Sequence, residues 1–231
     1  INNIQTDEYT IALNPNLLPT AQFSVPIQGN PTQFEAVSAT SVGESFIYED
    51  DPTKNGQFNV LYRNDNNGNG SNNTGFFVFF KQGSLNATKF NISNAVPNNY
   101  VPVNTHNITN SDQWLYSLNV NGGPQTKWTQ VPALTGNNII YNNITQGQRK
   151  VYSVITREND EISIKFGDGL FADVPRGIFR VWTRTSNGQT YMIRPDDMKN
   201  ITWDIQYFDK AGRQQSITFT ADLEVPVNNS T

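Results

Sequence analysis

The stretch Ile-Ser-Ile-Lys-Phe-Gly-Asp-Gly, residues 162–169, decides which fold we expect for this chain. Its apolar residues Ile162, Ile164 and Phe166 alternate with polar ones, and a period of two is typical of a strand with one buried face. The Gly-Asp-Gly that follows is typical of a tight turn. The stretch therefore predicts a strand that leads directly into a turn.

Each residue after that strand has a physical reason to be there. Gly167 and Gly169 can supply positive φ angles, and Asp168 can accept hydrogen bonds from nearby backbone amides. Pro175 makes the returning chain rigid, and Gly177 precedes a second strand-like run. A phosphate-binding loop would need a GxGxxG motif followed by a helical pattern, and neither occurs here. We interpret the segment as a structural turn between two strands.

Similar short runs extend outward from this point in both directions. No segment of ten or more residues has apolar positions at helical spacing, so little helix is expected. The Gln82-Gly83 pair predicts a hairpin turn between its flanking runs, and residues 95–110 are expected to be irregular. The predicted strands are 58–62, 75–81, 84–90, 113–120, 128–131, 139–141, 150–157, 178–185, 190–193, 201–208, 216–220 and 223–225.

The fold class expected from these runs is mainly β. Asparagine accounts for 32 of 231 residues, and it favours turns over helix interiors. We expect antiparallel strands in small barrel-like or sandwich-like domains with long Asn-rich loops. A cluster of Asn, Gln and Gly at 143–148 suggests two domains, 1–145 and 146–231. The first residue is not Met and the last four are Asn-Asn-Ser-Thr, which suggests a fragment of a longer protein.

The composition excludes several kinds of chemistry. The chain has no Cys, so disulfides, thiol catalysis and Cys-based zinc sites are excluded. Only 16% of residues are charged and the net charge is −4, which does not suggest a nucleic-acid partner. The apolar run at 76–80 is too short to cross a bilayer. These features favour a structural or binding protein over an enzyme, with no cofactor and no metal.

Three groups of residues are candidates for reactive or metal-binding sites. The run Glu49-Asp50-Asp51 could hold calcium, but an acidic run before a proline is more commonly a solvated loop. Glu158, Asp160 and Glu161 could serve glycoside hydrolysis, but a charged hairpin tip is the commoner explanation. His106 has no serine or carboxylate near it in the sequence, so a surface histidine is expected.

The turn and its flanking strands also carry a family likeness. Residues 162–169, with Pro175 and Gly177 ahead of the strand at 178–182, resemble the FGDG…P…G signature of the baseplate J-like family. These are baseplate wedge proteins of contractile-tailed bacteriophages and related injection machines. Residues 112–116, 149–154 and 223–230 resemble the larger wedge subunit of the myovirus group. The motif positions are Phe166, Gly167, Asp168, Gly169, Pro175 and Gly177.

The resemblance implies a mechanical role without catalysis. It implies a virion protein of the tail baseplate, assembled in the host cytoplasm, that dimerises within the wedge and binds other wedge proteins. The ring so formed surrounds the central hub and rearranges when the tail contracts, with no nucleic-acid or membrane partner. Trp114, Trp128 and Trp182 are candidate interface anchors, although for each of them a core position is the favoured explanation.

One alternative from a different class remains open. Exposed aromatic residues and Asn-rich loops would also suit a carbohydrate-binding or adhesin β domain, from a tail fibre or a secreted protein. The two hypotheses differ in what they expect of residues 166–177, which form a scaffold turn in the wedge protein and a ligand-binding loop in the adhesin.

Overall fold

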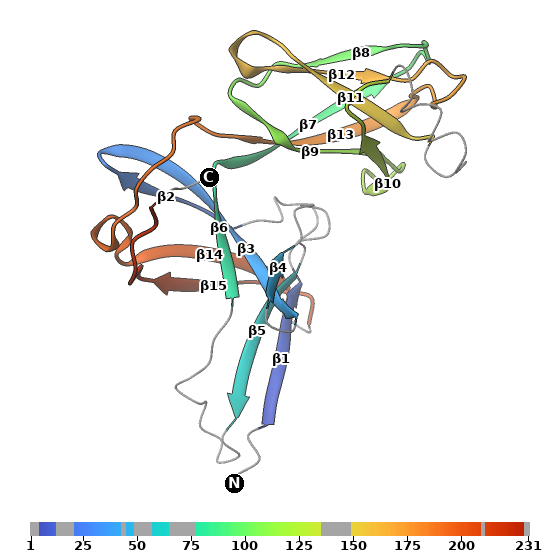
Figure 1. Cartoon of the computed structure of the whole chain (residues 1–231). Helices are drawn as coiled ribbons and strands as arrows, with labels where there is room; N and C mark the ends of the chain where they lie inside the picture. The colour runs from blue at the N-terminus through green and yellow to red at the C-terminus, as the bar shows by residue number, and fades with distance from the viewer. Residues whose placement is uncertain are drawn as a thin grey trace. The chain divides into compact units, whose positions relative to one another are not determined.

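The computed structural model describes residues 5–12, 21–42, 45–48, 57–64, 77–134, 149–208 and 211–228. The fold is mainly β, as the alternating runs predicted (Figure 1). Helix in the described residues is confined to two 3₁₀ turns, η1 (Glu158–Asp160) and η2 (Pro195–Met198). The chain divides into two compact units, one formed by residues 1–84 with 189–231 and the other by residues 85–188.

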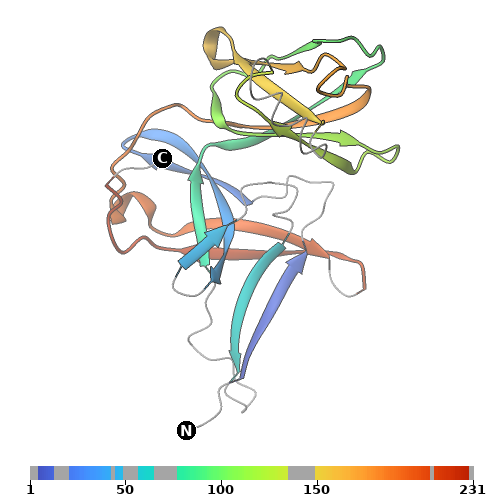
Figure 2. The same ribbon diagram turned by 45° about the vertical axis from the view of Figure 1, so that its right-hand side comes forward.

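The first unit contains three antiparallel sheets. β1 pairs with β5, β14 pairs with β15, and β3 pairs with β2, β4 and β6. Figures 1 and 2 show the β14–β15 pair as a long hairpin. The strands are β1 (Gln5–Ala12), β2 (Ala21–Ile27), β3 (Asn30–Val42), β4 (Ser45–Tyr48), β5 (Gln57–Asn64), β6 (Phe77–Gln82), β14 (Ile201–Phe208) and β15 (Gln214–Ala221).

Apolar faces from β2, β3 and β14 form the core of this unit. Phe23 of β2 stacks on Phe34 of β3 and on Trp203 of β14, with ring centroids 5.7 and 5.8 Å apart. Stacked aromatic rings add to the free energy gained by burying their area. A two-residue loop joins β2 to β3, and its residues Gln28 (φ 50) and Gly29 (φ 82) have the paired positive φ angles of a tight hairpin turn.

The second unit is a single seven-stranded sheet that closes almost completely into a barrel. Its order is β7-β13-β9-β10-β11-β12-β8. β10 and β11 run parallel and are joined by only two residue pairs. On their other sides, β10 pairs antiparallel with β9 and β11 pairs antiparallel with β12. The strands are β7 (Ser84–Ile92), β8 (Tyr100–Val103), β9 (Ile108–Leu118), β10 (Pro124–Gln130), β11 (Val151–Thr156), β12 (Ile162–Phe166) and β13 (Gly177–Thr185).

The strand predicted around Ile162, Ile164 and Phe166 is confirmed as β12. In β12 the side chains of Ile162, Ile164 and Phe166 are fully buried, and the two polar residues between them are half-buried. β12 pairs antiparallel with β11 and β8. The alternation of apolar and polar residues in β12 therefore identified correctly the face of the strand that points into the barrel.

Four sequence expectations were wrong or incomplete. The turn at Gly83 does not close a hairpin, because β6 pairs with β3 and β7 pairs with β13. Residues 95–110 are not wholly irregular, since β8 and the start of β9 lie there. Residues 190–193 and 223–225 form no strand, and only an isolated bridge joins Ile193 to Val227. In each case pairing depends on partners distant in sequence, which local patterns do not specify.

Two further expectations lie outside the described residues, namely the strand at 139–141 and the domain boundary at 143–148. The compact units divide elsewhere, because β9 and β10 share a sheet with β11, β12 and β13. Among the described residues, no helix has the length and apolar character needed to span a membrane.

Phe179 of β13 provides a test of the barrel core. Its ring is fully buried and lies 5.5 Å from the ring of Trp128 and 5.6 Å from that of Phe166, measured between centroids. Phe179→Ala should lower the free energy of unfolding by about 3 kcal/mol, because it leaves a cavity as well as removing apolar contact. Urea denaturation would measure this. Leu170→Ala, at a side chain that is 74% exposed, is the control and should leave stability unchanged.

Candidate functional site

The turn after β12 begins from an anchored aromatic ring. Phe166 is fully buried, and its ring meets that of Trp128 edge-on at a centroid distance of 5.4 Å. Its backbone N–H donates to the carbonyl of Asn99 (2.9 Å), and the carbonyl of Gly167 accepts from the N–H of Asn98 (2.8 Å). The end of β12 is therefore fixed both by packing and by backbone hydrogen bonds.

The glycines of the turn are required for two different reasons. Gly169 has φ +86° and Gly177 has φ +102°, which L side chains rarely adopt. Gly167, which the sequence suggested for positive φ, is not among the positive-φ residues. It is needed because a Cβ there would lie 2.3 Å from the Cβ of Ala172. The chain folds back so closely that only hydrogen fits at this position.

Asp168 ties the tip of the turn to its base. Its Oδ1 accepts hydrogen bonds from the backbone N–H groups of Leu170 (2.9 Å) and Phe171 (3.1 Å). The bond from Phe171 is the main cause that lowers the pKa of Asp168 below its ordinary value, against an opposing effect of burial. The carboxylate is thus already engaged by the chain's own amides.

Arg149 closes the turn from the outside. Its Nε lies 2.9 Å from Oδ1 of Asp173, and its Nη2 donates to the carbonyl of Gly169 at 3.4 Å. The N–H of Asp173 donates back to the carbonyl of Arg149 (2.8 Å), and Gly169 N–H donates to the carbonyl of Ala172 (2.9 Å). Pro175 is buried. The geometry is that of a closed structural turn.

The turn carries two apolar side chains at its tip that the sequence analysis did not single out. Leu170 is 74% exposed and Phe171 is 40% exposed. Both belong to residues whose amides bind Asp168, so the backbone beneath these side chains is held in one conformation. We call this pair the turn tip. Their exposure depends on the assembled fold, and no local pattern in the sequence distinguishes them from a buried pair.

The three candidate tryptophan anchors are buried within the second unit. Trp114 and Trp182 are register partners on β9 and β13 and share a cluster with Leu85. Trp128 lies in the main barrel core with Phe166. All three side chains are buried, which agrees with the core alternative stated for each of them.

The acidic groups and the single histidine lie around the β11–β12 hairpin. Glu158 and Asp160 are exposed in η1 at its tip. Glu161 is in an ion pair with Arg157 (3.2 Å) and lies 3.3 Å from Nδ1 of His106. The expectation that no carboxylate lies near His106 was wrong, because Glu161 is distant in the sequence but adjacent in space. Its side chain is 62% exposed, as expected of a surface histidine.

The run Glu49-Asp50-Asp51 lies outside the described residues. Within the part of the chain that the structure describes, no group of three or more His, Asp or Glu side chains is placed to hold a metal ion.

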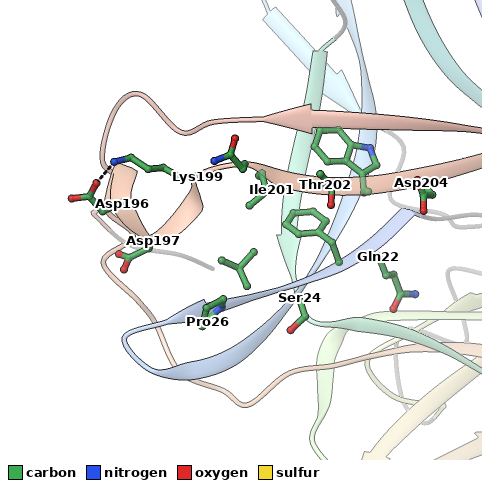
Figure 3. A pocket seen from close by; sticks show the side chains of 13 residues that line it. Gln22, Ser24, Pro26, Asp196, Asp197, Lys199, Ile201, Thr202 and Asp204 are labelled. Carbon is green, nitrogen blue, oxygen red and sulfur yellow. Dashed lines mark hydrogen bonds and ion pairs between the residues drawn. The ribbon is translucent and has the colours of Figure 1, made fainter.

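A groove in the first unit was not foreseen. It has a volume of about 530 Å³ and runs between β2 and the segment from η2 into β14 (Figure 3). Residues 22–26 line one wall and residues 196–197 and 199–204 line the other. Asp196 and Asp197 lie at one end and Asp204 at the other. No local motif signals this groove, because its walls are about 170 positions apart in the sequence.

Comparison with known proteins identifies the family. The family model described as "Domain of unknown function (DUF8360)" matches residues 1–226, and the chain belongs to this family. No curated protein and no solved structure matches the chain.

The close approach at Gly167 gives a first prediction for the turn. Gly167→Ala should destabilise the second unit by about 2 kcal/mol, because the added Cβ forces backbone to move. Gly123→Ala is the matched control, since that glycine is also outside the positive-φ region and a Cβ there would lie 3.2 Å from the end of the Asn119 side chain instead of against backbone. Thermal unfolding of both variants would decide. Equal melting temperatures for Gly167→Ala and the wild-type chain would contradict the packing described.

The hydrogen bonds of Asp168 give a prediction that depends on pH. Asp168→Ala should cost about 1 kcal/mol of stability at neutral pH, because two backbone N–H groups lose their acceptor. Since folding lowers the pKa of Asp168, its ionised form stabilises the native state above about pH 4 and this contribution is lost as the pH falls further. Denaturation from pH 7 to pH 2 should show the wild-type advantage shrinking. An advantage that stays constant would contradict the role given to the carboxylate.

Proposed function

We propose that the chain is a structural component of the baseplate wedge of a contractile bacteriophage tail. In this role it binds other wedge proteins, associates with a second copy of itself, and contributes to the ring around the central hub that rearranges on contraction. Its action is mechanical, through protein–protein contacts. The proposal starts from the resemblance of the segment 162–182 to the baseplate J-like signature, in a chain whose fold is mainly β.

The observation that carries the proposal is that polar groups of the turn are hydrogen-bonded to one another. The carboxylate of Asp168, the guanidinium of Arg149 and the carbonyl of Gly169 all bond within the segment. Chemistry on a substrate would need such groups to be available, whereas a scaffold needs them engaged. At the tip of the turn, the side chains that face outward are the apolar ones of Leu170 and Phe171. This arrangement suits the scaffold expected of a wedge protein better than the ligand loop expected of an adhesin.

A rigid apolar tip also suits strong protein contacts. Binding energy at protein interfaces is concentrated in a few side chains that enter pockets on the partner. Ordering a flexible loop opposes association, and a loop held by its own hydrogen bonds avoids that loss. Leu170 and Phe171 are held in this way through Asp168. We therefore expect the turn tip to contact a partner in the assembled baseplate.

The double variant Leu170→Ser, Phe171→Ser tests the proposal. The 231-residue chain would be co-expressed with each tail protein of the same phage and purified through a tag. The wild-type chain should co-purify with a wedge protein, and the variant should bind it at least about tenfold more weakly while keeping its melting temperature. Val120→Ser, at a side chain that is 98% exposed elsewhere in the unit, is the matched control and should bind normally.

Two outcomes would contradict the proposal. One is failure of the wild-type chain to bind any tail protein. The other is binding on a glycan array that the double variant abolishes, which would support the carbohydrate-binding alternative instead. Retained wedge binding by the double variant would remove the turn tip from the interface.

A further inference from the structure

The groove in the first unit is lined by strand edges. A wall made by the face of a strand would present every second residue, because side chains alternate between faces. Here the lining includes five consecutive residues of β2, 22–26, and the whole run 199–204. Both exposed side chains such as Ser24 and buried ones such as Phe23 take part. Consecutive lining of this kind means that the backbone edge itself borders the groove.

The register of the β2–β3 pair shows which backbone groups face outward. Ser24 is opposite Gln33 in this antiparallel pair. The carbonyl of Gln33 accepts a hydrogen bond from Gly83 N–H (2.7 Å), on the side of β3 away from β2. Opposed residues of an antiparallel pair either bond to each other or both point away. The N–H and C=O of Ser24 therefore point away from β3.

β2 is thus an edge strand whose outer side borders the groove. Among the strands that the structure describes, β2 pairs only with β3, and on the other wall β14 pairs only with β15. Exposed strand edges are templates for pairing with another chain. Pro26 lacks an N–H and so limits pairing at the end of β2 to its carbonyl. About five residues of an added strand would match the length of the lining run.

The charge of the groove indicates what kind of strand would fit. Its lining holds three carboxylates, Asp196, Asp197 and Asp204, and one ammonium group, Lys199. Lys199 is paired with Asp196, and that pair holds the pKa of Asp196 below its ordinary value. The groove therefore carries a net charge of −2. Charges at the rim of an interface act mainly on selectivity and association rate. The carboxylates of this groove therefore favour a strand with positively charged side chains.

We propose that the groove binds an extended, Lys- or Arg-bearing segment of a partner protein as an added β-strand. Its backbone pairs with the outer edge of β2 at Ser24, and its basic side chains lie toward the carboxylates at the two ends of the groove. In this mode of recognition the main chain supplies affinity and the side chains supply selectivity. The inference rests on the proposed assembly role in one respect: the bound segment would belong to a partner protein of that assembly.

Synthetic peptides test this on the intact 231-residue chain. The probe is a labelled peptide of alternating Lys and Val, KVKVKVK, with blocked ends. Two matched peptides are an acidic version, EVEVEVE, and KVKVKVK methylated at every backbone nitrogen, which cannot donate to a strand. Fluorescence anisotropy should show binding of the basic peptide, at least about tenfold weaker binding of the acidic one, and loss of binding on methylation.

Variants and hydrogen exchange locate the binding. The double variant Asp196→Asn, Asp204→Asn should weaken the basic peptide about fivefold. The double variant Glu158→Gln, Asp160→Asn, at two exposed carboxylates in the other unit, is the charge-matched control and should have no effect. Bound peptide should slow deuterium uptake in the fragment that contains residues 22–26.

Binding that survives methylation, protection that falls outside residues 22–26, or no binding at all would each overturn the inference. In the last case Pro26 and the carboxylates would act only to keep the edge of β2 from pairing. These results are separable from the test of the wedge role. Co-purification with tail proteins despite failed peptide binding would remove the groove alone, and peptide binding without co-purification would remove the wedge role alone.

Discussion

The packing of Phe166 against Trp128 and Phe179 is the constraint on which the second unit depends. These three rings come from β12, β10 and β13, and their centroids lie 5.4 to 5.6 Å apart. The hydrogen-bonded contact between β10 and β11 joins only two residue pairs. Aromatic packing across the barrel interior therefore supplements the backbone pairing where it is least extensive. It also fixes the point at which the turn after β12 begins, so the geometry of that turn follows from the core.

The sequence predicted what is decided locally. Alternation in β12 identified its buried face, because the period of side-chain direction in a strand does not depend on the partner strand. The turn at Gly83 was misjudged for the converse reason. Two adjacent runs and a glycine look alike whether the strands pair with each other or, as here, with β3 and β13. The first unit joins two segments separated by about a hundred residues, and no composition change along the chain signals such an assembly.

The candidate sites divide in the same way. The use of Asp168 as a backbone acceptor and the positive φ of Gly169 follow from residue type, and both are observed. The role of Gly167 does not, because its contact with Ala172 depends on how sharply the chain folds back. The exposure of the turn tip and the existence of the groove depend on the assembled fold. The carboxylate beside His106 was missed because Glu161 is distant in sequence and near only in space.

The two proposed surfaces differ in how they avoid unselective association. The turn tip exposes only Leu170 and Phe171, a small apolar area of a kind that ordinary surfaces tolerate. Its rigidity then favours a partner whose pocket matches it over one that merely offers apolar surface. The edge of β2 is bordered by carboxylates and ends at Pro26, which are devices that restrain edge-to-edge pairing. An acidic edge does not exclude strands in general, since it still admits a basic one. The features that restrain aggregation at each surface are therefore the features that would select its partner.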